Sequence, residues 1–175
     1  MELTSSQKGG VAELKIAAAA ADLGIDVYRP MIDGARCDLV FDVGARLLRV
    51  QCKWAALKDE LVVVRMRTSR HTPSRGYITT TYSASEIDGV AAYCRDLNRC
   101  FYLPIEEFEH RAFAYLRTAP TRNGQRVGVK MACDYPLGAV AQLGERVTGS
   151  HEVRGSSPLS STFEPTTASA RTIRA

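Results

Sequence analysis

Polar side chains flank two short apolar segments at a spacing that could bind a metal ion. Asp38 precedes the first segment, residues 39–43, while Gln51 lies in the second, residues 47–52, which Lys53 follows. Side chains two positions apart on a strand share a face, so Gln51 and Lys53 should point the same way. A turn between the two segments would make a hairpin and return Asp38 to their side. The spacing therefore predicts a carboxylate, an amide and an ammonium group at one place.

These groups suit a hard divalent cation. Mg²⁺ prefers oxygen ligands, keeps several waters and usually takes only one or two carboxylates. Asp38 offers a carboxylate, Gln51 an amide oxygen and Cys52 its backbone carbonyl. Lys53 has no lone pair when charged, but it could orient an attacking water or stabilise negative charge on a phosphate. The alternative interpretation is an ordinary hairpin with three solvated polar residues.

A helix before the hairpin is the element that could complete the site. Residues 4–6 are Thr-Ser-Ser, which are good caps, and the apolar stripe that follows predicts a helix to about Leu23. Glu13 is adjacent to this stripe, one residue before Leu14. It could project towards the strand ends and position a metal-bound water. The alternative is a solvated glutamate on the polar edge of the helix.

The ordered set Glu13, Asp38 and Gln51-Cys52-Lys53 resembles the PD-(D/E)xK nuclease superfamily over roughly residues 7–110. Gln51 replaces the family's middle acid, as in the branch of homing endonucleases associated with group I introns. The literal Pro-Asp pair is missing, because Pro30 stands eight residues before Asp38.

The resemblance implies an α/β fold: a mixed central sheet flanked by helices, the restriction-endonuclease-like core. It implies Mg²⁺, with Mn²⁺ as a substitute, bound by Asp38, Gln51, Cys52 and Glu13. The catalytic residues it implies are Glu13, Asp38, Gln51 and Lys53.

The rest of the chain should supply scaffold and DNA contacts. We expect strands at 25–28, 61–67 and 99–104 and helices at 85–94 and 105–115. The helix at 85–94 should start at a Ser-x-x-Asp capping box. Residues 54–59 should form a turn before the strand at 61–67. We interpret residues 68–76 as an exposed loop whose basic side chains, among Ser and Thr, contact phosphate. The DNA-binding candidates are Arg65, Arg67, Arg70 and Arg75; the alternative is a solvated loop, and His71 is a weaker candidate for a general base.

Composition limits the class of protein. The chain has 175 residues, enough for one domain, a formal net charge of +4 and a pI near 8.9, which fits a polyanionic partner. Its five Cys without a Cys-x-x-Cys motif indicate reduced thiols and a cytoplasmic protein. No apolar segment approaches the roughly twenty residues of a membrane helix, and we expect no membrane partner.

The C-terminal segment has an unusual composition. We expect a nuclease domain at 1–136 and a disordered tail at 137–175, which is rich in Gly, Ser and Thr without periodicity. Residues 140–146 can be encoded by a tRNA D-arm and residues 155–158 by a T-arm, and the fifteen codons between them match the offset in a tRNA. Codons for 147–148 and 150–151 can also pair as an anticodon stem. We therefore interpret residues 138–162 as read-through of a tRNA gene; a chance Ser/Gly-rich tail is the alternative.

These observations together predict a Mg²⁺-dependent DNA endonuclease, similar to homing endonucleases, that hydrolyses phosphodiester bonds. Its partner would be double-stranded DNA, and cutting both strands favours a homo-dimer or higher homo-oligomer. The alternatives are a Holliday-junction or repair nuclease, and a catalytically inactive DNA-binding module.

Overall fold

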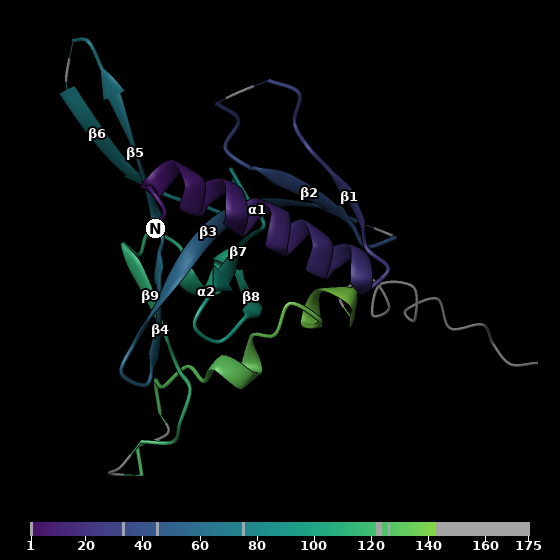
Figure 1. The fold of residues 1–175 in the computed structure, drawn as a ribbon, viewed down its shortest axis with the longest axis vertical. Helices are drawn as coiled ribbons and strands as arrows, with labels where there is room; N and C mark the ends of the chain where they lie inside the picture. Colours follow the sequence, from purple (N-terminus) through teal and green to yellow (C-terminus); the bar gives the residue numbers. More distant parts are fainter. Residues whose placement is uncertain are drawn as a thin grey trace, which may run out of the picture.

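A mixed sheet with one long helix across it forms the body of the protein (Figure 1). The computed structural model describes residues 2–32, 34–44, 46–74, 76–121, 124–125 and 127–142, with only the backbone of residues 70 and 71. The described elements are α1 (Ser5–Asp22), β1 (Asp26–Tyr28), β2 (Leu39–Asp42), β3 (Leu47–Lys58), β4 (Leu61–Arg65), β5 (Arg67–Thr72), β6 (Gly76–Thr81), β7 (Gly89–Cys94), β8 (Arg99–Pro104), α2 (Ile105–Phe108), β9 (Phe113–Arg117) and the 3₁₀ turn η1 (Ala132–Asp134).

Strand β3 is the centre of the sheet. Its first part pairs antiparallel with β2, its middle pairs parallel with β7, and its last residues pair antiparallel with β4. Strand β8 then extends the sheet beyond β7, β1 extends it beyond β2, and β9 beyond β4. The expected α/β class with a mixed central sheet is confirmed.

Helix α1 covers one face of this sheet. Thr4 caps it through a capping box with Gln7, and it ends at Asp22, so the expected helix to about Leu23 is present. Its buried residues are Ala12, Ile16 and Ala20. The two alanines let the helix lie close to the sheet because a methyl group needs little space.

The sheet has a hydrophobic cluster on each face, and the strands alternate between them. In β7, Ala91 and Tyr93 pack on the face that α1 covers, while Val90, Ala92 and Cys94 pack on the other face. Such alternation follows from the period of two along a strand. Because both faces are buried, β7 carries no charged side chain between Gly89 and Cys94.

The expected helix at 85–94 is wrong, because residues 89–94 form β7. The six residues are all buried and lie between β3 and β8, where a continuous apolar segment is typical of a parallel strand covered on both faces. The apparent capping box has another role: the Asp88 carboxylate accepts hydrogen bonds from Arg49 N at 2.7 Å and Arg49 Nε at 3.0 Å.

The expected helix at 105–115 is wrong beyond its first turn. Helix α2 ends at Phe108, and His110 has a positive φ of 59°, which a helix cannot contain. Residues 113–117 form β9 because Ala114 and Leu116 alternate inward against β4.

Two further expectations need correction around residues 54–76. No turn interrupts residues 54–58, which continue β3 to Lys58, and the strand expected to reach residue 67 ends at Arg65. The expected loop at 68–76 is largely part of an antiparallel hairpin, β5–β6. Its threonines favour strands, and Ser69 faces Thr79 across the pair, with their hydroxyl oxygens 2.9 Å apart.

The packed part of the chain extends past the expected boundary at residue 137. Leu137 and Val140 are buried in the cluster that α1 covers, at 4% and 0% exposure. Val140 lies in a short helical segment, residues 139–142. The remainder of the expected tail, from residue 143, lies outside the described residues.

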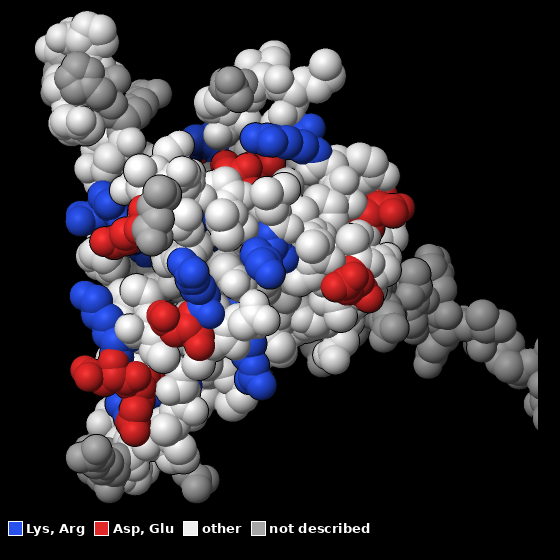
Figure 2. All heavy atoms as spheres, in the orientation of Figure 1, with Lys and Arg blue, Asp and Glu red and all other residues white. Residues whose placement is uncertain are grey.

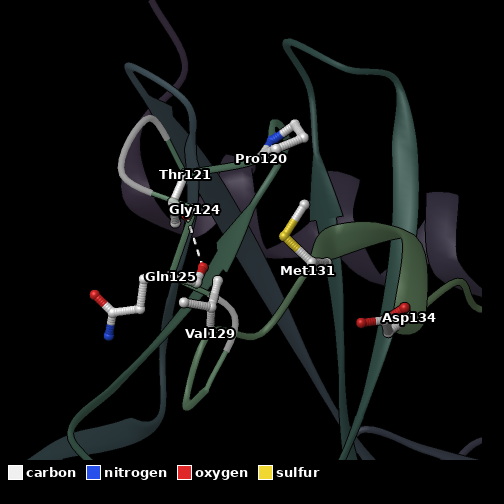
Figure 3. A pocket seen from close by; sticks show the side chains of 7 residues that line it. All are labelled: Pro120, Thr121, Gly124, Gln125, Val129, Met131 and Asp134. Atoms are coloured by element: carbon white, nitrogen blue, oxygen red, sulfur yellow. Dashed lines mark hydrogen bonds between the residues drawn. The ribbon is translucent and has the colours of Figure 1, made fainter.

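A pocket of about 420 Å³ lies beside η1 (Figure 3). Pro120, Met131 and Asp134 contribute to its lining, and Thr121 Oγ1 donates a hydrogen bond to the Gln125 carbonyl at 2.7 Å. The pocket shares no lining residue with the polar groups predicted to bind metal. Among the described helices, none is long and apolar enough to cross a membrane.

Candidate active site

The Asp38 carboxylate is the centre of the candidate site. Asp38 directly precedes β2, and its backbone N–H donates to the Val50 carbonyl at 2.9 Å, so it is fixed beside β3. Its Oδ2 accepts a hydrogen bond from the backbone N–H of Cys52 at 2.8 Å and another from Gln51 Nε2. The predicted return of Asp38 to β3 is therefore present in the structure.

Strand β3 places Gln51 and Lys53 on one side and Val50 and Cys52 on the other. Val50 and Cys52 are buried in the cluster under α1, and Gln51 is only 9% exposed. The Cys52 thiol lies among apolar groups, and burial, followed by Asp38 and Glu13, raises its pKa. Its side chain therefore has the environment of a core residue, whereas its backbone faces Asp38.

Glu13 reaches the same place from α1. Glu13 and Asp38 both line a small polar pocket of about 60 Å³, together with Arg29, Pro30 and Cys37. This volume is enough for water molecules. The two carboxylates are close enough to interact electrostatically. Burial is the largest cause that raises the pKa of Glu13, and the charge of Asp38 is the next.

Burial also raises the pKa of Asp38, against the opposing effects of the Cys52 N–H, Lys53, Gln51 and Arg29. Burial is the largest cause of both rises, so each carboxylate has lost part of its hydration in the folded protein. A bound cation would favour their charged forms. The site therefore has oxygen donors from two partly buried carboxylates that a divalent ion could bind.

The donor set is small. Among the described residues, no group of three or more His, Cys, Asp or Glu could hold an ion together. Mg²⁺ does not require one, since it is commonly bound through one or two carboxylates plus water and substrate phosphate. The amide nitrogen of Gln51 donates to Asp38, which leaves the amide oxygen of the same side chain available as a metal ligand.

Lys53 lies in a partly buried position beside an aromatic ring. Burial lowers its pKa, Asp38 opposes this, and Arg65 and Arg36 lower it further. Its Nζ lies 5.3 Å from the ring centroid of Tyr82, and the Arg36 guanidinium lies 5.2 Å from the same ring. Two cations thus lie near the same aromatic ring.

Three residues near the site were missed by sequence reasoning: Arg29, Arg36 and Tyr82. Arg29 Nη2 lies 3.4 Å from Glu13 Oε2, and Arg36 donates to Glu86 at 2.8 Å and to the Thr81 carbonyl at 3.1 Å. Arg29 and Arg36 lie far from their neighbours in the sequence, so no local pattern could predict these contacts. Tyr82 is also part of the hydrophobic core, being 1% exposed.

Of the four arginines predicted to bind DNA, Arg65 ends β4, and Arg67 and Arg70 lie in β5. Arg65 is exposed and donates to Ser69 Oγ at 3.2 Å, while the Arg67 guanidinium lies 5.2 Å from the Phe113 ring centroid. The side chain of Arg70, like that of His71, is not described, and Arg75 lies outside the described residues.

A helix that packs on a mixed sheet, with an aspartate beside a Gln-x-Lys strand, defines a protein of the endonuclease fold. The chain matches the PD-(D/E)XK endonuclease family over residues 3–137, and it belongs to that family. It is therefore a nuclease with DNA as its substrate class, and nucleases of this family generally use divalent metal ions.

A solved structure agrees with this assignment. The bacterial homing endonuclease I-Ssp6803I is 26% identical, with a TM-score of 0.66 over 83% of this chain and 99% of that chain. No curated protein sequence matches this chain significantly.

Proposed function

We propose that this protein is a Mg²⁺-dependent DNA endonuclease that cleaves both strands of a specific duplex target, as a homing endonuclease does. The observation that carries the proposal is that Glu13 and Asp38, from separate elements, line one polar pocket. Asp38 also accepts a hydrogen bond from Gln51 and interacts electrostatically with Lys53. The similarity to a bacterial homing endonuclease supports the biological class.

Asp38, Gln51 and the Cys52 carbonyl would hold the ion, and Glu13 would orient a water bound to it. When bound, the ion supplies an acidified water and neutralises charge on the scissile phosphate. Mn²⁺, with the same preference for oxygen ligands, would be a substitute.

Lys53 would orient the attacking water and stabilise negative charge that develops on the phosphate. Its lowered pKa brings the amine closer to neutral pH, where it can exchange a proton with that water. Asp38 would hold Lys53 near the phosphate through their electrostatic attraction.

Arg65, Arg67, Arg70 and Arg75 would supply positive charge to the DNA backbone. Cutting both strands requires two copies of the site, so we expect a homo-dimer or a higher homo-oligomer.

A matched pair of lysine variants tests the proposal. Lys53→Ala should abolish plasmid cleavage in Mg²⁺ while leaving DNA binding largely intact. Lys58→Ala is the control, because Lys58 is an exposed residue at the end of the same strand. Cleavage by Lys53→Ala at the wild-type rate, or cleavage by wild type that EDTA does not stop, would contradict the proposal.

We also propose that residues 138–162 are encoded by an overlapping tRNA gene. The burial of Val140 means that the first part of this segment also serves the fold. The DNA sequence tests the proposal, because codons that break the D-arm, anticodon and T-arm stems would reject it.

A further inference from the structure

The β5–β6 hairpin projects from the body of the protein (Figure 1). It is a separate two-stranded sheet whose strands pair from Arg67↔Thr81 to Thr72↔Gly76. The connection between β1 and β2, which carries Arg29 and lines the site pocket, projects from the same side of the sheet. The hairpin therefore lies on the side of the molecule where a substrate of the site would approach.

The net charge of the chain is concentrated around this hairpin. The chain has 23 basic and 19 acidic residues, and residues 61–85 contain four arginines but no lysine, aspartate or glutamate. The remainder thus has 19 basic and 19 acidic residues and no formal net charge. On the face in Figure 2, acidic and basic side chains are interspersed over the body, whereas the described atoms of the projecting part of the hairpin are neither acidic nor basic in this view.

One face of the hairpin presents hydroxyl groups. Successive side chains alternate, so Ser69, Tyr77 and Thr79 share a face, and Tyr77 is 79% exposed. Ser69 and Thr79 bond across the strands, and Arg65 donates to Ser69 from the body. Hydroxyls donate and accept hydrogen bonds, so they can contact base edges as well as phosphates.

The other face is attached to the catalytic region. Arg36 donates to Thr80 Oγ1 at 3.3 Å and to the Thr81 carbonyl, and it lies over the Tyr82 ring that also contacts Lys53. The base of the hairpin is thereby fixed relative to Lys53. A duplex contacted by the hairpin would have a defined position relative to the site.

The dimensions fit a DNA groove. Six residues per strand give a length of about 20 Å, because a strand rises about 3.3 Å per residue. At about 3.4 Å per base pair this corresponds to about six base pairs. The B-DNA major groove is about 12 Å wide and admits a two-stranded β-ribbon.

We infer that the β5–β6 hairpin enters the major groove as a β-ribbon and reads bases through the face that carries Ser69, Tyr77 and Thr79. The inference rests on the proposed function, since it takes duplex DNA as the substrate. It goes beyond contact with phosphate, because it assigns sequence preference to uncharged side chains.

A binding selection on duplexes with randomised positions tests this without cleavage, using the full chain with Lys53→Ala. Adding Ser69→Ala and Thr79→Ala should reduce the preference at one or more base pairs about five-fold or more. The slope of log K against log salt should stay unchanged, because no charge is removed.

A second variant replaces residues 70–78 with a two-residue Asn-Gly turn between the facing pair Ser69 and Thr79. This variant removes Arg70 and Arg75, so the slope of log K against log salt should become shallower by about 2, at about 0.9 per phosphate contact. The base preference over about six base pairs should also be lost. Arg95→Ala is the control, because Arg95 is exposed in the turn after β7 and should alter neither quantity.

Unchanged base preference in both hairpin variants, or a loss of affinity equal for all sequences, would overturn the inference. A change of oligomeric state in the shortened variant with unchanged base preference would also overturn it, because the hairpin would then be a subunit contact. Plasmid cleavage by the wild type tests the proposed function separately, so the two can fail independently.

Discussion

Restoring the acid that is usual in this family's motif, by Gln51→Glu, should make the stability of the protein depend on metal. Gln51 is 9% exposed and donates a hydrogen bond to Asp38. A glutamate there removes the donor and places a third carboxylate beside Asp38 and Glu13. Without metal, we expect the folded state to be destabilised.

The magnitude follows from two limits. Two like charges about 4 Å apart repel by about 4 kcal/mol at an effective dielectric constant of about 20. Proton uptake by one carboxyl avoids this repulsion at a cost of about 3.7 kcal/mol at pH 7, from an ordinary pKa of about 4.3. Since the protein takes the cheaper route, the loss should be about 3.7 kcal/mol, which lowers Tm by about 7–15 °C for a chain of this size.

Magnesium should reverse most of this loss. A ligand at about 100 times its Kd stabilises the folded state by about 2.7 kcal/mol, and a third carboxylate should tighten binding of the ion. Thermal unfolding followed by circular dichroism, in EDTA and in Mg²⁺, measures both effects. Gln7→Glu is the control: Gln7 is an exposed member of the Thr4 capping box, where Glu accepts the same hydrogen bond.

The reasoning is refuted if Gln51→Glu and wild type unfold at the same temperature in EDTA. It is also refuted if Mg²⁺ raises the Tm of Gln51→Glu no more than that of wild type, because Gln51 would then not border the ion. A shift in Gln7→Glu of comparable size would mean that the charge change acts non-specifically.

Three other outcomes follow from the structure. The folded-state pKa of Glu13 is raised, so its ionised form opposes folding at neutral pH. Glu13→Gln should therefore be more stable than wild type in EDTA near pH 7. Thermal unfolding at several pH values should show this gain vanish as the pH falls through the folded-state pKa of Glu13. Gly89→Ala should destabilise by about 1–3 kcal/mol in urea unfolding, because a Cβ there would lie 2.4 Å from the Tyr102 ring, whereas Gly138→Ala, whose nearest neighbour would be 3.7 Å away, should change little. Truncation after residue 136 should lower Tm, since burying a side chain such as Val140 contributes about 1.5–3 kcal/mol, while truncation after residue 142 should not.

The sequence by itself determined the elements whose signals are local. The capping residues and apolar stripe before Gly24 predicted α1, and the apolar segments around Gly44 predicted the β2–β3 hairpin that returns Asp38 to Gln51. Strand periodicity and a short connection suffice for such a contact, because neighbouring elements have few other ways to pair.

Tertiary structure decided the elements whose partners are distant. Residues 89–94 have an apolar pattern compatible with a buried helix or strand, and only the place between β3 and β8 makes them a strand. Residues 113–117 became β9 because β4 offered an edge to pair with. The contacts of Arg36 with the hairpin and with Tyr82, and of Tyr82 with Lys53, arise for the same reason. Residues 36, 53 and 82 become neighbours only when the strands that carry or flank them pack together.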